Sequence, residues 1–498
     1  MKRLFFLLLL VLMAGCGGSG GGSDTTGTGG DTTGSGDVTI TGTVAGTTFV
    51  AVDVASDTVV ARKVAVSQNG SKVFTVKVQS GKQYKFYLIE NEGTDNERVF
   101  PLYIGTDNKF NLSTGTCDLG FVSTATGKAK PSKEPKQFSG VGEDITVPAG
   151  VAKNQASVFK QSDLAGSWYF FQFKSGEHSQ WWRSTLTVDT TGAATSTNSS
   201  NSDEYSEQTE NHKLNIDPSG VITIPNSDIQ LIMSKDKNLF VGVGNSNNGN
   251  GRMMMIGIKA GSKFNPSDLA GTTWKGHELR AGIQSGMRGW SRSNVTISGS
   301  GLATTTNVIK DPDPSSDSVG PGGSSEGGSV TLLPADNSGA IKVTSSSTLE
   351  SLYGAITPDK NMMVYVSTNH NAYLTTNKII SFGILVRTGK TTFSQADLMG
   401  NWRKNLLGLT TTDAYWCRDL TVIDSNGTEN KNRICNGELI QDTSRSTTVP
   451  KIDKQGIILV DGLPGAEAIM TPNKQMMVFT KTDTSSNPYE YHLEVYVK

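Results

Sequence analysis

The sequence predicts an all-β exported protein with an N-terminal β-sandwich followed by three repeated antiparallel meander β-barrels. Three observations predict this fold class. One sequence pattern occurs three times in the last two-thirds of the chain, apolar residues alternate with a period of two, and long helical periodicity is missing. The 498 residues include 56 Gly, as expected for short strands joined by many turns.

The first 36 residues predict export and a tether. Lys2-Arg3 precedes an apolar run that is too short to span a bilayer as a helix. We therefore interpret residues 1–15 as a signal peptide. Residues 16–36 consist, after Cys16, almost entirely of Gly, Ser, Thr and Asp, which is typical of a flexible linker that buries nothing.

The end of this signal has the form of an anchoring motif. Met13-Ala14-Gly15-Cys16 resembles the bacterial lipoprotein box, although Met13 stands where Leu is usual. The resemblance implies lipidation of Cys16, which would make the membrane a partner through a lipid anchor. It also implies a location in the bacterial cell envelope, at the outer membrane or cell surface because no acidic residue stands directly after Cys16. An ordinary cleaved signal with a chance Cys is the alternative.

Composition excludes some classes of function. The formal net charge of −1 gives no electrostatic reason to bind nucleic acid. The five His do not stand at metal-ligand spacing with one another or with Cys, and no phosphate loop or haem-attachment string is present. We therefore expect no cofactor, no metal and no catalytic residue that a motif would reveal.

Residues 37–124 alternate in the manner of short strands, for example at Val50, Val52 and Val54, and predict a β-sandwich. This segment resembles carboxypeptidase-regulatory-like and related immunoglobulin-like modules, which implies a spacer or docking role. Residues 125–158 carry Pro and Lys and predict an extended, semi-rigid linker.

The three copies occupy residues 159–260, 264–388 and 393–498, and each is expected to fold as a separate domain. Copy two is longer because of a low-complexity insertion at about 310–329. Each copy opens with Phe, Asp-Leu, Gly and Trp: Phe159, Asp163, Leu164, Gly166, Trp168; Phe264, Asp268, Leu269, Gly271, Trp274; Phe393, Asp397, Leu398, Gly400, Trp402. A second shared block follows late in each copy at 234–238, 357–361 and 471–475.

The opening motif, the meander and a cation at the end of each copy resemble the lipocalin-like superfamily. The resemblance implies a barrel whose first-strand Trp packs at the closed end beneath a late basic residue. Trp168 with Lys259 and Trp402 with Lys498 match this pattern, whereas copy two spaces its Gly and Trp one residue further apart. A β-propeller-like assembly is the alternative, because the second block resembles a blade turn, but blades recur every 40 to 50 residues or so.

The positions of two cysteines predict a disulfide bond. Cys417 and Cys435 flank Asn426-Gly427, a turn that would place them opposite each other on a hairpin. An exported protein can form such a disulfide. Cys117 is then left over, as a buried thiol or, alternatively, as half of an intermolecular bond.

One constellation suits ligand binding. An aromatic residue stands beside an Arg at the same place in each copy: Trp182 and Arg183, Trp290 and Arg292, Trp416 and Arg418. Aromatic faces next to a guanidinium suit sugar rings or planar ligands. The alternative is core packing, because Trp182 and Trp416 share strand faces with apolar neighbours.

These observations predict a non-enzymatic cell-envelope lipoprotein that acts as a surface binding or scaffold protein for an unknown ligand, glycan or envelope protein. A purely structural envelope protein and an enzyme of unrecognised type are the alternatives. A lumen able to hold a ligand would favour binding, and a convergent cluster of titratable residues would favour an enzyme.

Overall fold

A computed structural model describes residues 36–498 with internal gaps. The gaps are residues 46, 69–70, 95, 155–156, 177–178, 203–208, 247–250, 262, 283–287, 311–326, 333–337, 345–348, 372–373, 411–412, 441–444, 448, 461–465 and 484–489. The predicted signal peptide, Cys16, nearly all of the tether and most of the low-complexity insertion lie outside the described residues. No helix within the described ranges combines the length and the apolar character needed to cross a membrane.

The N-terminal part is a β-sandwich, as predicted. One sheet has the order β10 (Lys130–Pro131), β9 (Gly115–Ser123), β1 (Asp37–Val44), β5 (Ser71–Gln79), β4 (Val66–Gln68). The other has the order β11 (Phe138–Gly140), β8 (Lys109–Leu112), β6 (Gln83–Glu90), β2 (Thr48–Asp53), β3 (Thr58–Val64), and β7 (Arg98–Pro101) pairs with β6. Their inward side chains form one core that contains Phe49, Phe74, Phe86 and Phe110.

The segment expected to be a linker is built into the sandwich. Two of its strands, β10 and β11, each extend one of the two sheets, and the Phe138 ring lies 5.2 Å from that of Phe110. Further along, Val151 and Val158 pack against Val50 in a second cluster. Prolines and lysines at the surface suggested an extended chain, but the apolar residues between them supply enough buried area to hold the segment down.

Each copy is one meander in which the first strand pairs with the last. Copy one contains η2 (Gln161–Leu164), β12 (Gly166–Gly176), β13 (Gln180–Val188), β14 (Ala193–Asn201), β15 (Glu210–Lys213), β16 (Asn215–Ile216), β17 (Val221–Thr223), β18 (Gln230–Met233), β19 (Leu239–Asn245) and β20 (Gly251–Lys259). Copy two contains η3 (Pro266–Asp268), β21 (Thr272–Gly282), β22 (Arg288–Ile297), β23 (Leu302–Lys310), β24 (Gly327–Leu332), β25 (Ala340–Thr344), β26 (Leu349–Ile356), β27 (Met362–Asn371) and β28 (Leu374–Arg387).

Copy three contains α1 (Gln395–Leu398), β29 (Gly400–Leu409), β30 (Ala414–Asp424), β31 (Gly427–Cys435), β32 (Glu438–Ile440), β33 (Arg445–Ser446), β34 (Lys451–Ile452), β35 (Ile457–Leu459), β36 (Glu467–Met470), β37 (Met476–Asp483) and β38 (Glu490–Val497). Copy two is a closed barrel of eight strands. Copies one and three are curled sheets of nine and ten strands. In their described residues, no ladder joins the two outer ends of these sheets. Because each copy closes on its own first strand, the propeller alternative does not describe this fold.

The strands of copy one are apolar on both faces. Along β12, Trp168 points into the lumen of its own copy with Leu186 and Phe240. Alternate residues of the same strand, such as Phe171 and Phe173, point outward into a core that all three copies share. The copies are therefore one body rather than the three separate domains expected from the sequence.

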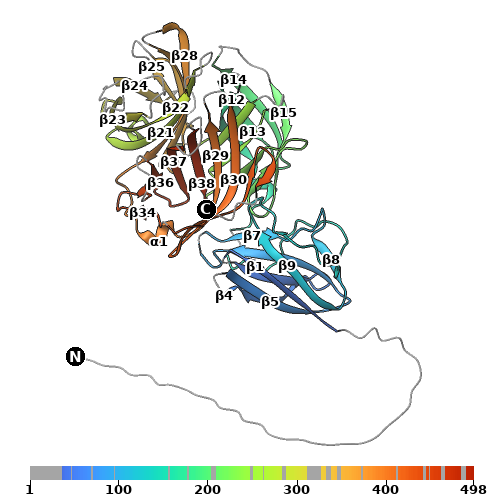
Figure 1. Cartoon of the computed structure of the whole chain (residues 1–498). Coiled ribbons are helices and arrows are strands. Elements are labelled where there is room, and N and C mark those ends of the chain that lie inside the picture. The colour runs from blue at the N-terminus through green and yellow to red at the C-terminus, as the bar shows by residue number, and fades with distance from the viewer. Residues whose placement is uncertain are drawn as a thin grey trace, which may run out of the picture. The chain divides into compact units, whose positions relative to one another are not determined.

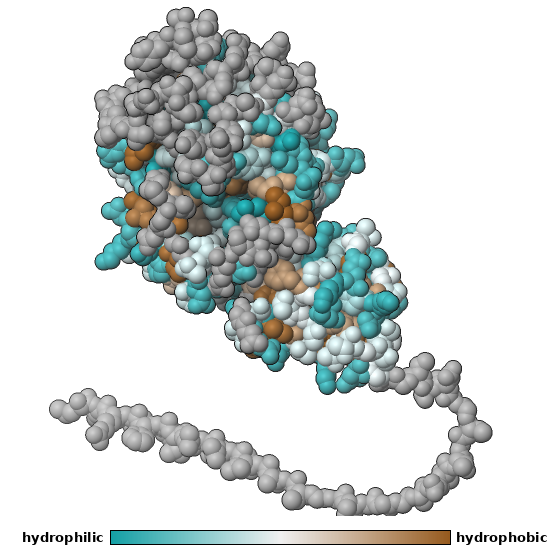
Figure 2. Space-filling view, viewed as in Figure 1, coloured by the Kyte–Doolittle hydropathy of each residue, from teal (hydrophilic) through white to brown (hydrophobic). Residues whose placement is uncertain are grey.

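The shared core is built from three joints that repeat in cyclic order. Strands β12 and β13 contact β27 and β28, strands β21 and β22 contact β37 and β38, and strands β29 and β30 contact β19 and β20. Figure 1 shows strands from the three copies side by side in this part of the fold. The coloured surface of the sandwich is mostly hydrophilic or neutral, with brown confined to small areas (Figure 2), which agrees with an apolar interior.

Candidate functional site

The two repeated sequence blocks meet at one end of each copy. In copy three, Asp397 Oδ2 accepts a hydrogen bond from the backbone N–H of Ser394, and its Oδ1 lies 2.9 Å from Lys474 Nζ. The same ion pair joins Lys237 to Asp163 at 2.8 Å and Lys360 to Asp268 at 2.7 Å. The repeated motif therefore fastens the closed end of each copy.

The first-strand tryptophans close that end beneath a cation, as the lipocalin resemblance implies. The distance from the cation to the ring centre is 5.3 Å for Lys259 over Trp168, 5.9 Å for Arg387 over Trp274 and 4.6 Å for Lys498 over Trp402. All three rings are at most 1 % exposed. Copy two keeps the arrangement despite its extra residue, with Arg387 as the cation.

The aromatic residues predicted as ligand contacts are instead found at the joints. Trp290 Nε1 donates to Thr482 Oγ1 at 3.0 Å, and Trp416 Nε1 donates to Asn245 Oδ1 at 3.0 Å, each in a neighbouring copy. These two side chains are 4 % and 0 % exposed. We therefore assign Trp290 and Trp416 to packing between copies rather than to ligand contact or to a barrel lumen.

In copy one the equivalent residue is Trp181 and not Trp182. Trp181 pairs with Phe173 in the sheet and donates from Nε1 to Thr368 Oγ1 at 2.9 Å, whereas Trp182 is 37 % exposed. The ladder between β12 and β13 runs without a shift; the register shifts near the Arg lie in the next ladder of each copy and place the extra residue in β14, β23 and β31. Trp182, opposite Gln172, therefore shares a face with Leu186 as the alternation predicts, but its neighbour Trp181 is the residue that packs between the copies.

The three arginines also lie at the joints. Arg183 lies over the Tyr353 ring of copy two, 3.8 Å from its centre, and Arg292 lies 3.9 Å from Glu467 of copy three. Burial lowers the pKa of Arg418 to about 10, with Asp228 of copy one acting in the opposite direction. Each Arg therefore faces the next copy.

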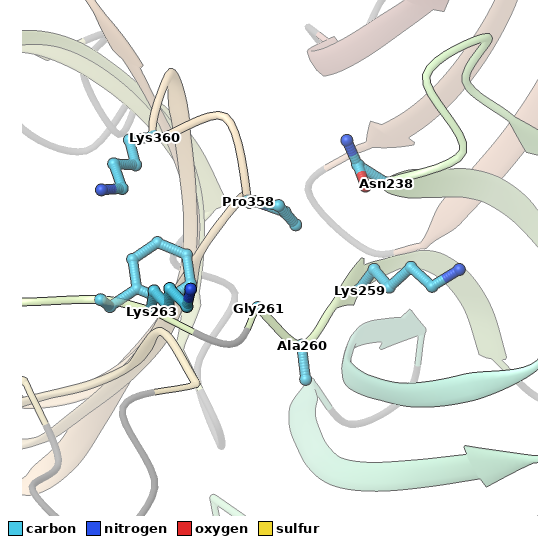
Figure 3. A pocket seen from close by; sticks show the side chains of 8 residues that line it. Asn238, Lys259, Ala260, Gly261, Lys263, Pro358 and Lys360 are labelled. Carbon is cyan, nitrogen blue, oxygen red and sulfur yellow. The ribbon is translucent and has the colours of Figure 1, made fainter.

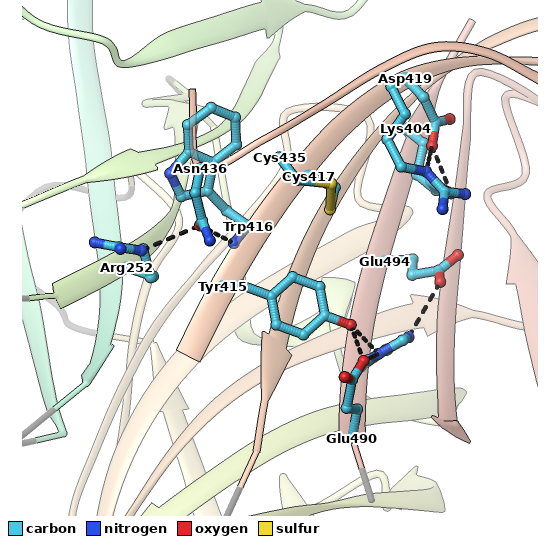
Figure 4. Close-up of a disulfide and its surroundings, with 12 residues drawn as sticks. Arg252, Lys404, Tyr415, Trp416, Cys417, Asp419, Cys435, Asn436, Glu490 and Glu494 are labelled. Atoms are coloured by element: carbon cyan, nitrogen blue, oxygen red, sulfur yellow. Dashed lines mark hydrogen bonds and ion pairs between the residues drawn. A yellow bond between two sulfur atoms is a disulfide. The ribbon is translucent and has the colours of Figure 1, made fainter. Parts of the chain in front are cut away.

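The cysteines lie as predicted. Cys417 and Cys435 are directly opposite on β30 and β31 and form a disulfide (Figure 4). Cys117 is a free buried thiol in the sandwich core.

A network of charges fills the lumen of copy three beside this disulfide. Asp419 Oδ2 lies 2.7 Å from Lys404 Nζ and 3.3 Å from Arg433 Nε, and Glu494 Oε1 lies 3.2 Å from Lys481 Nζ. Burial raises the pKa of Glu494, but Lys481 and Lys404 outweigh it and hold that pKa well below its usual range. The network therefore keeps its charges inside the copy.

A second set of polar groups lies next to this network. His492 Nε2 lies 2.5 Å from Tyr415 Oη and 3.3 Å from Glu490 Oε2, and Tyr415 also donates to Glu490. Burial and Glu490 raise the pKa of Tyr415. The side chains of Glu490, Lys481 and Arg433 are 23 %, 25 % and 27 % exposed, so this cluster reaches solvent at the end of the copy opposite Trp402.

The same positions are apolar in copy one. Lys404 stands two residues after the first-strand Trp, where copy one has Phe170. Glu494 and His492 stand four and six residues before the final cation, where copy one has Met255 and Met253. Sequence analysis missed this cluster, although His492 and Glu494 alternate with apolar residues on one strand.

A hollow of about 420 Å³ lies between the closed ends of copies one and two. It is lined by Asn238, Lys259, Ala260, Gly261, Lys263, Phe264, Pro358 and Lys360. Figure 3 shows the turn that carries Pro358 and Lys360 on one side and the turn that carries Asn238 on the other. Lys259 of copy one, Lys360 of copy two and Lys263 of the connection between them belong to the lining of this cleft, and Lys360 is paired with Asp268.

The described part of the chain contains no group of three His, Cys, Asp or Glu side chains arranged to hold a metal ion. No protein-family model and no curated protein matches the sequence.

Solved structures with some likeness to the chain include two transferrin binding proteins B. The Haemophilus parasuis vaccine antigen, a mutant form, has 10 % identity and a TM-score of 0.23 over 66 % of this chain and 76 % of that one. The Neisseria meningitidis isotype 1 protein has 7 % identity and a TM-score of 0.20 over 64 % and 62 %. A Nostoc punctiforme protein of unknown function from the DUF3598 family has 11 % identity and a TM-score of 0.20 over 47 % and 99 %.

Proposed function

We propose that the protein is a lipid-anchored, non-enzymatic binding protein of the bacterial envelope, and that the charged lumen of copy three is its binding site. The observation that carries this proposal is the network of Lys404, Asp419, Lys481 and Glu494 inside one copy, where copy one has an apolar lumen. Buried ion pairs are often neutral or destabilising compared with apolar residues of similar size. Binding of a ligand by these charged side chains would explain why the lumen contains them.

The position of the lumen supports display away from the anchor. Ala45 O, just after the end of β1, accepts a hydrogen bond from Asn401 Nδ2 of copy three. Asp37 lies at the other end of β1, roughly 25 Å away at about 3.3 Å per residue. Strand β29 begins at Gly400, beside this contact, and runs along copy three to Leu409, and we infer that the open end of copy three faces away from Asp37.

The anchor is tested on the mature protein from its own membrane. We expect the intact mass to include diacylglycerol and an acyl chain on Cys16, and we expect Cys16→Ser to release the protein from the membrane fraction. A mature chain that begins elsewhere, or that carries no acyl mass, contradicts the anchor but leaves the binding site untouched.

The binding site is tested by native mass spectrometry of the same preparation. We expect a retained small molecule on the wild type and its loss from Lys481→Met/Glu494→Met, which replaces one buried ion pair by apolar side chains. Lys133→Gln/Asp118→Asn removes an ion pair on the sandwich, whose side chains are 63 % and 52 % exposed, and is the matched control. A wild type without ligand, together with a charge-free variant that is only more stable, would favour the structural alternative.

A specific observation favours an enzyme as the second candidate. Tyr415, His492 and Glu490 lie within hydrogen-bond distance of one another, and such groups exchange protons with a bound substrate in general acid–base catalysis. An enzyme would convert the retained molecule with time. Tyr415→Phe would then stop the conversion but keep the molecule bound, whereas a binding protein returns it unchanged in both forms.

A further inference from the structure

The sandwich uses one acidic loop to cover the closed ends of copies three and one. This loop joins β6 to β7. Glu90 at its start lies 3.0 Å from Arg403 Nη2, and the backbone oxygen of Glu97 accepts a hydrogen bond from Lys235 Nζ. Asn96 Oδ1 accepts from Gln475 Nε2 at 2.8 Å. These groups leave the closed ends of copies three and one buried.

Arg98 at the end of the loop completes this contact. Its guanidinium lies over the Phe159 ring, 5.2 Å from the ring centre. It donates to the main-chain oxygens of Lys498 at 2.8 Å, Ser219 at 2.7 Å and Met233 at 2.8 Å. The covered place is therefore framed by the final cation of copy three and the opening Phe of copy one.

The cleft between copies one and two is equivalent by the repeat to the covered site between copies three and one. Its lining residues stand at the repeat positions that meet the loop between copies three and one. Asn238 corresponds to Gln475, Lys259 to Lys498, Pro358 to Lys235 and Phe264 to Phe159. In the cleft between copies one and two, the connecting chain occupies part of the space, and Gly261 N–H donates to Ser338 O. At the equivalent position between copies three and one, Arg98 donates to Ser219 O. A hollow of about 420 Å³ is left.

Three lysine side chains contribute to the lining of this hollow. Lys360 is paired with Asp268 at 2.7 Å. Lys259 lies over Trp168, and burial lowers the pKa of its ammonium. Lys263 is exposed, and within the described ranges no acidic side chain forms an ion pair with it. At the covered place, the Glu90 carboxylate lies opposite Arg403 of copy three, and the backbone oxygen of Glu97 accepts from Lys235 of copy one, while the Glu97 carboxylate bonds within the sandwich. The described residues that line the open cleft include no Asp or Glu.

We propose that the cleft between copies one and two docks an acidic loop of a partner protein, as the 90–97 loop docks between copies three and one. The occupant meets Lys259, Lys263 and Lys360 with carboxylates and packs against Phe264 and Pro358. This surface lies at the closed ends of the copies, so the partner and a ligand in the lumen of copy three bind independently.

The experiment uses the full chain and a synthetic peptide with the sequence of residues 90–97, which carries four carboxylate side chains. We expect saturable binding of one peptide per chain and hydrogen-exchange protection at residues 259–264 and 357–361. Lys263→Glu should weaken binding at least tenfold, because it replaces attraction by repulsion. Lys77→Glu makes the same charge change on an exposed sandwich strand and should leave the affinity within twofold.

Further measurements test whether the binding depends on the charges of the peptide and on a protein partner. A peptide with Glu and Asp changed to Gln and Asn should bind at least tenfold more weakly than the acidic peptide. If the acidic peptide does not saturate, or if Lys263→Glu binds it as well as Lys77→Glu does, the proposal is overturned. If inorganic phosphate protects the same residues and displaces the peptide at equal concentration, the cleft is a simple anion site and the protein partner is rejected.

Discussion

Asn473 Nδ2 lies 3.0 Å from Asp236 Oδ2 and 3.2 Å from Asp359 Oδ2. These residues occupy one position of the second repeated block, which is Asp in copies one and two and Asn in copy three. The three turns thus converge, and the amide of copy three donates to both carboxylates. A third Asp would have placed three negative charges together.

We expect Asn473→Asp to destabilise the protein at neutral pH by about 2–4 kcal/mol, through two lost donors and like-charge repulsion at short range. The new carboxyl should have a raised pKa, so the destabilisation grows as pH rises through the unfolded-state value near 4. Urea unfolding midpoints at pH 4 and pH 7 measure this. Asn111→Asp, on an exposed sandwich position, is the control, and equal midpoint shifts for the two variants would contradict the repulsion.

The contacts between the copies predict that alanine substitutions at two adjacent tryptophans change the stability by different amounts. Trp181→Ala should cost about 3–5 kcal/mol, as truncation of a buried Trp does, and should lower the midpoint of all three copies together because the core is shared. Trp182→Ala, at the exposed neighbour, should stay within about 0.5 kcal/mol of wild type. Hydrogen exchange resolved by copy measures both. Early opening of copy one alone would show that the copies are independent after all.

His277 predicts a loss of stability in mild acid. Its side chain is fully buried, its Nδ1 lies 3.0 Å from Thr480 Oγ1, and burial with Arg292 and Lys275 nearby lowers its pKa well below 6.5. Below about pH 6.5, His277 is therefore protonated in the unfolded chain but stays neutral in the folded chain. Stability is complete above pH 6.5 and falls as the pH drops below it.

The matching variant takes the residue that copy one has at this position, Phe171. His277→Phe should flatten the unfolding midpoint between pH 6.5 and about 5, whereas His212→Phe, at an intermediate position of β15 in copy one, should leave the slope unchanged. A wild type with no slope in this range would mean that His277 is protonated in the folded state.

The disulfide is expected to make a measurable contribution to the free energy of unfolding. Cys417→Ser/Cys435→Ser should cost about 3 kcal/mol, the value expected for a closed loop of this size. In the lipidated mature protein, a thiol reagent should label no cysteine in the native state and only Cys117 after unfolding, because burial protects that thiol and raises its pKa to about 11. Labelling of Cys117 in the native protein would place it at the surface.

The all-β class, the N-terminal sandwich, the meander in each copy, the disulfide and the closed-end Trp beneath a cation were predictable, because period, turn residues and repeats are local signals. The joints were not. Trp416 and Trp290 have the same pattern whether they face their own lumen or a neighbouring copy, and only the pairing of β30 with β29 and of β22 with β21 shows which face they take. The lumen cluster was missed because His492 and Glu494 are brought to Tyr415 only by strand pairing.

The cyclic order of the joints also limits how many copies such a chain can hold. Each copy offers two different faces, one from its first two strands and one from its last two, and each face meets the other kind on a neighbour. Head-to-tail contacts of this kind close only when the rotation between neighbours divides the circle. At three copies every face is covered. A chain with two would expose an apolar face at each end, so the copy number is as much a property of this fold as its strand order.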